Sequence, residues 1–265
     1  MGEGSLSGKW AVILGASSGF GAATALELAK LGVNIVGVHL DRRASLPAVE
    51  QLVHTLTDHK VQALYFNVNA ADPANRKDVL DHVAPKIGGT HVAVLLHSLA
   101  FGTLKPYVSK DPKEQLTKDQ MDMTLDVMAN SLVYWVQDLF DRKLIGKGSR
   151  IFAMTSSGGT RVWPYYGAVS AAKAALESHI RQLALELAPF GVTANAIRAG
   201  VTDTPALRKI PGNDQMMEVA KLKNPHRRLT TPEEVACALA LFSNSGAGWM
   251  TGNVIGVDGG EDITG

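Results

Sequence analysis

The sequence predicts an α/β protein built on a doubly wound parallel sheet of about seven strands, with helices on both faces. Short β-branched or apolar runs alternate with longer helical patterns along almost the whole chain. Continuous apolar strands separated by helices are typical of a parallel sheet that is buried on both faces. The 265 residues, 46% of them hydrophobic, are enough for a substantial core. Because no repeat or Pro/Ser-rich linker divides the chain, we expect a single domain over residues 1–265.

The elements follow one another in order. Each expected strand is a short run of β-branched and other apolar residues: Trp10–Leu14, Asn34–Val38, Val61–Phe66, His91–Leu96, Arg150–Met154, Thr193–Ile197 and Val254–Val257. Each expected helix is a longer segment with helical periodicity: Phe20–Leu31, Leu46–His59, Pro73–Ala84, Gln120–Ile145, Tyr166–Ala188 and Pro232–Ser243. The stretch 202–229 interrupts this alternation with several prolines and a Met-rich helical piece, Gln215–Leu222. An insertion of this kind predicts a lid over the cleft.

Composition excludes several classes of function. The 26 basic residues balance 25 acidic ones, so we expect no nucleic-acid partner. The single cysteine, Cys237, excludes an internal disulfide framework and fits a reducing compartment. No segment approaches the length of a membrane span, and the scattered histidines suggest no metal site. We therefore expect a cytoplasmic protein without a membrane span or a catalytic metal.

The first expected strand runs directly into a glycine-rich turn, which an amphipathic helix follows at once. Glycines permit a tight turn and a close approach of the backbone to a ligand. The helix N-terminus offers unpaired N–H groups and a positive dipole end to a pyrophosphate. The turn therefore predicts a dinucleotide site, and its expected contacts are Gly15, Ser17, Ser18, Gly19, Phe20 and Gly21.

A tyrosine and a lysine, Tyr166 and Lys173, stand seven residues apart at the head of a later helix. Seven residues are almost two turns, so both side chains should face the same way. A phenol beside an ammonium is an acid/base device, because the cation favours phenolate and lowers the pKa of the phenol. A packed tyrosine and a solvated lysine would give the same pattern, but the glycine turn favours the catalytic interpretation.

These motifs resemble those of the short-chain dehydrogenase/reductase family over nearly the whole chain. Besides the glycine turn, the resemblance rests on Asn67-Val68, Asn130, Thr155-Ser156-Ser157 and the ending at 250–260. It implies a Rossmann-type fold and a nicotinamide dinucleotide cofactor, with contacts from Asn67, Val68, Ser98, Lys173, Ile197 and Thr202. It also implies a homodimer or homotetramer. Extra apolar positions in two long helices, among them Leu132, Trp135 and Leu139, favour such an oligomer.

The cofactor is chosen by the residues after the second strand. An acidic residue at the strand end would accept the ribose hydroxyls of NAD, whereas arginines would attract the 2′-phosphate of NADP. By the family's spacing this position falls on His39 or Leu40, and neither is acidic. Arg42 and Arg43 follow shortly afterwards, so we expect NADPH, while Asp41 keeps NADH as the alternative.

The tyrosine spacing distinguishes one branch of the family. Most short-chain reductases carry Tyr-x3-Lys, but Val169 occupies that tyrosine position here, and Tyr-x6-Lys resembles the bacterial enoyl-acyl-carrier-protein reductases. The run from His97 to Phe101 and the residue Ala199 resemble the same branch. In an enoyl thioester, hydride goes to the β-carbon while charge develops on the thioester oxygen, so the hydrogen-bond donor must lie farther from the hydride source.

The leading hypothesis is NADPH-dependent reduction of the carbon–carbon double bond of trans-2-enoyl thioesters, as in fatty acid synthesis. Acyl-carrier protein or coenzyme A would carry the acyl chain. Lys173 would bind the nicotinamide ribose, Tyr166 would bind the thioester oxygen, and Ser156 would help to position it. Tyr165 is a second candidate for the acid, and the lid residues Met216 and Met217 would cover the acyl chain.

Two other functions stay open. Ser156, Asn130 and Lys173 match the pattern of ordinary ketoreductases, so reduction of a ketone or aldehyde, such as a 3-ketoacyl group, is an alternative. A catalytically silent dinucleotide-binding protein is another, and it would bind NADPH without turnover.

Overall fold

The computed structural model describes residues 6–264, whose strands form one parallel sheet in the order β3-β2-β1-β4-β5-β6-β7. The strands are β1 (Trp10–Leu14), β2 (Asn34–His39), β3 (Ala63–Asn67), β4 (Val92–His97), β5 (Arg150–Thr155), β6 (Thr193–Ala199) and β7 (Val254–Val257). The predicted doubly wound sheet is confirmed. Residues 1–5 and 265 of the expected domain lie outside the described residues, and the single-domain organisation stays a prediction.

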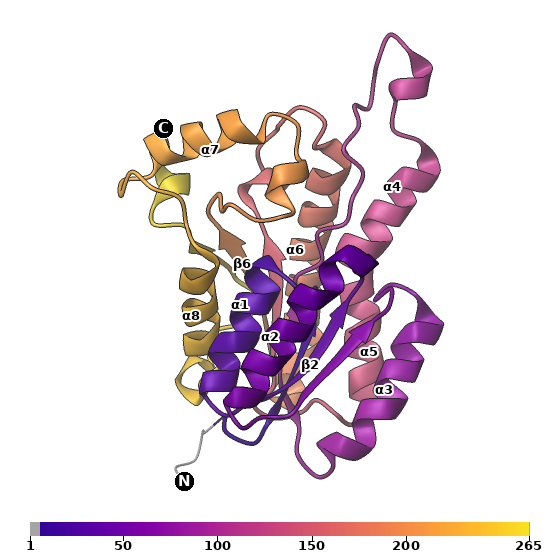
Figure 1. Ribbon diagram of the computed structural model, residues 1–265, viewed down its shortest axis with the longest axis vertical. Coiled ribbons are helices and arrows are strands. Elements are labelled where there is room, and N and C mark those ends of the chain that lie inside the picture. The colour runs from indigo at the N-terminus through magenta and orange to yellow at the C-terminus, as the bar shows by residue number, and fades with distance from the viewer. Residues whose placement is uncertain (1–5, 265) are drawn as a thin grey trace.

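Helices cover both faces of the sheet (Figure 1). They are α1 (Gly19–Lys30), α2 (Leu46–Asp58), α3 (Pro73–Ile87), α4 (Lys118–Leu125), α5 (Ser131–Asp141), α6 (Gly167–Leu187), α7 (Asn213–Lys223) and α8 (Pro232–Phe242). None of the helices within residues 6–264 is long and apolar enough to cross a membrane.

The sheet separates two apolar cores. Alternate residues of a strand point to opposite faces, so along β1 Val12 and Leu14 enter one core while Ala11 and Ile13 enter the other. The first core packs under α3, α5 and α6, and the second packs under α1, α2 and α8. Burial on both faces explains why the strands are continuously apolar in sequence.

The prediction of one continuous helix over Gln120–Ile145 is wrong, because the structure has two helices there. A π-helical turn, Asp126–Asn130, separates α4 from α5. The hydroxyl of Ser131 donates to the carbonyl oxygen of Val127 at 2.8 Å, one turn back along the helix. Such a side-chain bond competes with the regular helical ladder. The helix also ends early, at Asp141, because Lys143 has a left-handed φ of 58°.

The apolar positions that favoured an oligomer are not surplus. Leu132, Trp135 and Leu139 all have 0% exposure and belong to the core under α3, α5 and α6. The indole Nε1 of Trp135 donates to the carbonyl oxygen of Ala70 at 2.8 Å. These three residues therefore give no support for an oligomer, which stays a prediction from the family resemblance.

A tyrosine of β3 carries a polar group into the second core. A Cβ atom added to Gly37 would lie 2.6 Å from Cζ of Tyr65, so the ring packs directly against β2. The Tyr65 hydroxyl is buried and has no hydrogen-bond partner among residues 6–264, and burial raises its pKa. A buried, unpaired polar group destabilises the folded state.

We expect Tyr65→Phe to leave the free energy of unfolding unchanged or to raise it by about 1 kcal/mol, because it removes this unpaired hydroxyl. Urea unfolding measures the change. As a control, Trp135→Phe removes a hydrogen bond that is made, and it should lower the free energy of unfolding. A clear loss of stability in Tyr65→Phe would mean that the hydroxyl has a partner.

Candidate active site

The residues singled out in the sequence meet at one edge of the sheet, where the parallel strands reach their carboxyl ends. In chain order they are the glycine turn after β1, Asn67 at the end of β3 and Val68 next to it, Ser98 after β4, Ser156 after β5, Ile197 within β6, and Thr202 shortly after β6. Ile197 and Thr202 are both buried. In open α/β sheets, ligands bind in the crevice outside these ends.

The glycine turn is fixed by two close backbone approaches. Gly15 has a φ of 87°, and a Cβ atom there would lie 2.3 Å from the carbonyl oxygen of Ser98. A Cβ atom on Gly21 would lie 2.0 Å from the carbonyl oxygen of Gly15. Only glycine fits at these two positions. The side chain of Ser18, the N-cap residue, makes no capping bond, so it leaves the first N–H groups of α1 available to an anion.

Asp41, just after β2, is held in a fixed position by the side chain of Asn67 at the end of β3. Its main-chain N–H donates to Asn67 Oδ1 at 2.9 Å, and Asn67 Nδ2 donates back to the Asp41 carbonyl at 3.0 Å. The Asp41 carboxylate lies 2.9 Å from Nδ1 of His39, whose side chain is buried rather than open to a ligand. Arg42 and Arg43 are exposed, and their side chains make no ion pair or hydrogen bond within residues 6–264.

Tyr166 is the N-cap residue of α6, which begins at Gly167. The preceding Tyr165 has a left-handed φ of 65°, which is uncommon for a bulky residue. A Cβ atom on Gly158 would lie 2.5 Å from Cε1 of Tyr166, so the ring rests against the loop that follows β5. The position of the phenol therefore depends on this loop as well as on the helix.

The phenol of Tyr166 stays protonated. Burial raises its pKa, and only the nearby hydroxyl of Ser156 acts in the opposite direction. The expected lowering of this pKa by Lys173 is therefore wrong for this structure. The Ser156 Oγ atom is itself buried and makes no hydrogen bond of regular geometry within residues 6–264. Two neighbouring hydroxyls thus offer hydrogen bonds to a shared acceptor.

Lys173 lies inside the protein under the end of β5. Its Nζ donates to the carbonyl oxygen of Met154 at 2.6 Å. Burial lowers its pKa to about 8, while Glu177 acts in the opposite direction. The Glu177 carboxylate in turn accepts a hydrogen bond of 2.7 Å from the hydroxyl of Thr155. The ammonium is therefore held at a fixed point of the sheet edge.

Asn130 and His97 are engaged elsewhere. The side-chain Oδ1 of Asn130 lies 3.1 Å from Nε2 of His179 on α6. His97 is fully buried, with Nε2 2.9 Å from the Ser131 hydroxyl, and burial lowers its pKa to about 3. The histidine is therefore neutral at physiological pH, because burial disfavours its charged form.

A cavity of about 420 Å³ lies beside the tyrosines. Two of the four predicted substrate residues, Tyr165 and Tyr166, line it. The other two, Met216 and Met217, are half-buried on α7 and do not line it. Other residues that line the cavity were not predicted from the sequence, above all Lys105, Tyr107 and Trp163. Trp163 lies in the same stretch as the tyrosines, so its aromatic character was an available signal. Lys105 and Tyr107 belong to no sequence motif, and they come from the loop between β4 and α4.

Comparison with known proteins gives consistent matches. A family model described as enoyl-(acyl carrier protein) reductase matches residues 15–261. The 1-cyclohexenylcarbonyl-CoA reductase of Streptomyces collinus is 29% identical over 255 residues, 95% of this chain and 86% of that protein. The 3-oxoacyl-(acyl-carrier-protein) reductase of Pseudomonas aeruginosa is 27% identical over 256 residues, 97% of this chain and 98% of that protein. The structure resembles the enoyl-(acyl-carrier-protein) reductase (NADH) of Aquifex aeolicus, with a TM-score of 0.84, 24% identity and 98% of both chains covered.

Replacing the buried lysine should stabilise the protein. Because burial holds the pKa of Lys173 at about 8, below its ordinary value of 10.5, the folded state disfavours the ammonium. This cost is fully present below pH 8 and fades as the pH rises toward 10.5. We expect Lys173→Met to raise the free energy of unfolding by at most about 3 kcal/mol at neutral pH, with a smaller gain at higher pH. Urea unfolding across this range tests it, and a gain that grows with pH would contradict it.

Proposed function

The chain belongs to the short-chain dehydrogenase/reductase family, as the family model that matches residues 15–261 shows, and we propose that it is an NADPH-dependent reductase of trans-2-enoyl thioesters. The observation that carries the proposal is the buried phenol of Tyr166, which rests against the loop after β5 at Gly158 and lies beside the buried hydroxyl of Ser156. A neutral donor suits an oxyanion that develops on a thioester carbonyl, away from the carbon that receives hydride. The similarity to a reductase of 1-cyclohexenylcarbonyl-CoA, an unsaturated acyl thioester by its name, supports this substrate class.

Each side chain has a distinct role in this proposal. Tyr166 and Ser156 donate hydrogen bonds to the thioester oxygen and stabilise its negative charge in the transition state. Lys173, fixed on the Met154 carbonyl, holds the nicotinamide ribose through its remaining ammonium protons. The cavity beside Tyr165 and Tyr166 takes the acyl part. NADPH, when bound, would supply the hydride to the β-carbon, and the enolate left on the thioester would take its α-carbon proton from solvent water.

The residues at the glycine turn and at the end of β2 fit this cofactor. The α1 N-terminus has no side-chain cap, and the close approaches at Gly15 and Gly21 leave a backbone surface for the pyrophosphate. The Asp41 carboxylate is engaged by His39, whereas Arg42 and Arg43 are free to pair with a 2′-phosphate. These contacts support NADPH over NADH.

Reduction of a 3-ketoacyl thioester is the second candidate. Ser156 favours it, as does the similarity to a 3-oxoacyl-(acyl-carrier-protein) reductase. We place it second because the Asn130 side chain is held by His179. A silent dinucleotide-binding protein would bind NADPH without turnover of either substrate. For an active enzyme we expect acyl-carrier protein or coenzyme A as the carrier, a cytoplasmic location, and a dimer or tetramer.

The choice of substrate can be tested directly. We expect the purified protein to oxidise NADPH with a medium-chain trans-2-enoyl thioester, and Tyr166→Phe to lower kcat about a hundredfold because it removes one oxyanion donor. Ser156→Ala should have a smaller effect. A matched 3-ketoacyl thioester is the comparison substrate. If only the keto substrate turns over, and Ser156→Ala is the more harmful change, the second candidate replaces the first.

The cofactor preference has its own test. Removing both free guanidinium groups with Arg42→Gln/Arg43→Gln should raise KM for NADPH by at least about tenfold, since each lost charge pair weakens phosphate binding. KM for NADH should hardly change, because NADH has no 2′-phosphate. Steady-state kinetics with both cofactors give the result. An equal rise for NADH would mean that these arginines do not select the cofactor.

A further inference from the structure

We propose that the C-terminal segment 258–264 positions Tyr166, and that Asp262 is the positioning residue through which it acts. We call this segment the C-terminal clasp. The inference rests on the proposed function only for its kinetic test, because the contacts that define the clasp are independent of the substrate.

The tyrosine needs support from outside its own loop. Residues 157–165 join Ser156 to Tyr166, and most of residues 160–165 are exposed. The main-chain hydrogen bonds of this loop are local, such as those from Thr160 and Arg161 to the Ser157 carbonyl. Packing and local bonds alone therefore leave the loop few constraints.

Two side chains tie the loop to distant parts of the described chain. The guanidinium of Arg161 donates to the Asp262 main-chain carbonyl at 2.8 Å and lies 2.9 Å from its carboxylate. On the other side of the loop, Nε1 of Trp163 donates to the Pro211 carbonyl at 3.2 Å, just before α7. The loop is thus anchored once to the clasp and once to the predicted lid, residues 202–229.

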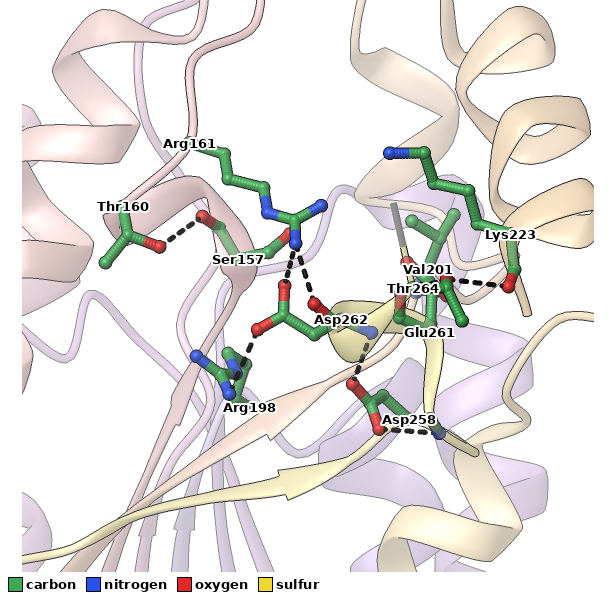
Figure 2. Close-up of polar contacts among 11 residues, drawn as sticks. Ser157, Thr160, Arg161, Arg198, Val201, Lys223, Asp258, Glu261, Asp262 and Thr264 are labelled. Atoms are coloured by element: carbon green, nitrogen blue, oxygen red, sulfur yellow. Dashed lines mark hydrogen bonds and ion pairs between the residues drawn. The ribbon is translucent and has the colours of Figure 1, made fainter. Parts of the chain in front are cut away.

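Asp262 connects the loop to the sheet (Figure 2). Its second carboxylate oxygen lies 3.0 Å from the guanidinium of Arg198, which stands beside Thr155 in the register of β5 and β6. Asp258 fixes the clasp in turn, because its carboxylate accepts from the N–H groups of Gly260 and Asp262, both at 3.0 Å. One carboxylate therefore joins the tyrosine loop to the strand next to the one that carries Ser156.

The clasp also reaches the lid and the exit of β6. Glu261 accepts a hydrogen bond of 3.0 Å from the N–H of Val201, next to the predicted nicotinamide contact Thr202. The hydroxyl of Thr264 donates to the Lys223 carbonyl at 2.8 Å, at the end of α7. With the Trp163 bond, the contacts form a closed ring that runs through the loop, the lid and the clasp.

This ring gives Asp262 an effect on catalysis that differs from its effect on stability. A partly exposed ion pair contributes little to folding. A small displacement of a catalytic group, however, can lower the rate strongly. Asp262→Asn keeps the size of the side chain but removes the charge that both arginines face, so it should alter the loop without disrupting the sheet.

The experiment compares Asp262→Asn and Arg161→Gln with the control Asp81→Asn. Asp81 on α3 also lies between two cations, 2.6 Å from Lys77 and 2.6 Å from Arg142, but away from the site. We expect both clasp variants to lower kcat about tenfold, with the NADPH dissociation constant within about twofold of wild type. The control should leave kcat unchanged.

Two further readouts separate positioning from a merely structural role. In a Tyr166→Phe background, Asp262→Asn should lower kcat less than about twofold, because the residue acts through the phenol that is already missing. Hydrogen exchange of residues 157–165 should become faster in both clasp variants and stay unchanged in the control. Equal losses of kcat in both backgrounds, or unchanged exchange, would overturn the proposal.

The outcomes also distinguish this proposal from the proposed function. If the wild type reduces neither thioester, the proposed function fails, and hydrogen exchange alone decides whether the clasp holds the loop. If Asp262→Asn does not fold, Arg161→Gln tests the same contact from the loop itself.

Discussion

The site depends on a buried ammonium at the edge of the sheet. The apolar face of α6 packs against the sheet, and this places Lys173 under β5, where its Nζ reaches the Met154 carbonyl. The charge is unfavourable there, as its lowered pKa shows. Once the lysine is fixed, the helix register puts Tyr166 at the start of α6, beside the end of the same strand. A residue whose charged form is disfavoured by burial thereby sets the geometry of the site.

The fold could be predicted because its signals are local. Continuous apolar strands, amphipathic helices and the glycine turn each follow from short stretches, and parallel strands place their ends at one edge without further information. The π-helical turn before Ser131 could not be predicted in this way. It involves a bond from Ser131 back to Val127 and a contact with His97 on another element. The apolar excess of α5 was misleading for a related reason, because burial of Trp135 is decided by α3 and the sheet.

The candidate site, like the fold, could be predicted where its signals are local in sequence and not where they depend on contacts between distant residues. Glycine spacing and the Tyr-x6-Lys pattern identified residues that the structure brings to one edge. The pKa of Tyr166 could not be foreseen, since it depends on burial and on the distance between side chains. The contact from Arg161 to Asp262 joins two residues that are 101 positions apart in the chain, and neither position belongs to a motif. Such contacts become visible only when the loops are placed in space.

The fold itself does not decide between the two chemistries. Relatives of similar identity include a reductase of an unsaturated thioester and a reductase of 3-oxoacyl groups, so the scaffold accommodates both. The discriminating feature must lie in the donors that face the substrate oxygen. A phenol with a lowered pKa, close to its lysine, can pass a proton to the carbon-bound oxygen of a ketone. A phenol kept neutral by burial, with a serine as its partner, is better suited to holding an oxyanion than to transferring its proton. The buried environment of Tyr166, more than the spacing of the motif, is therefore the physical basis of our proposal that the protein reduces a double bond.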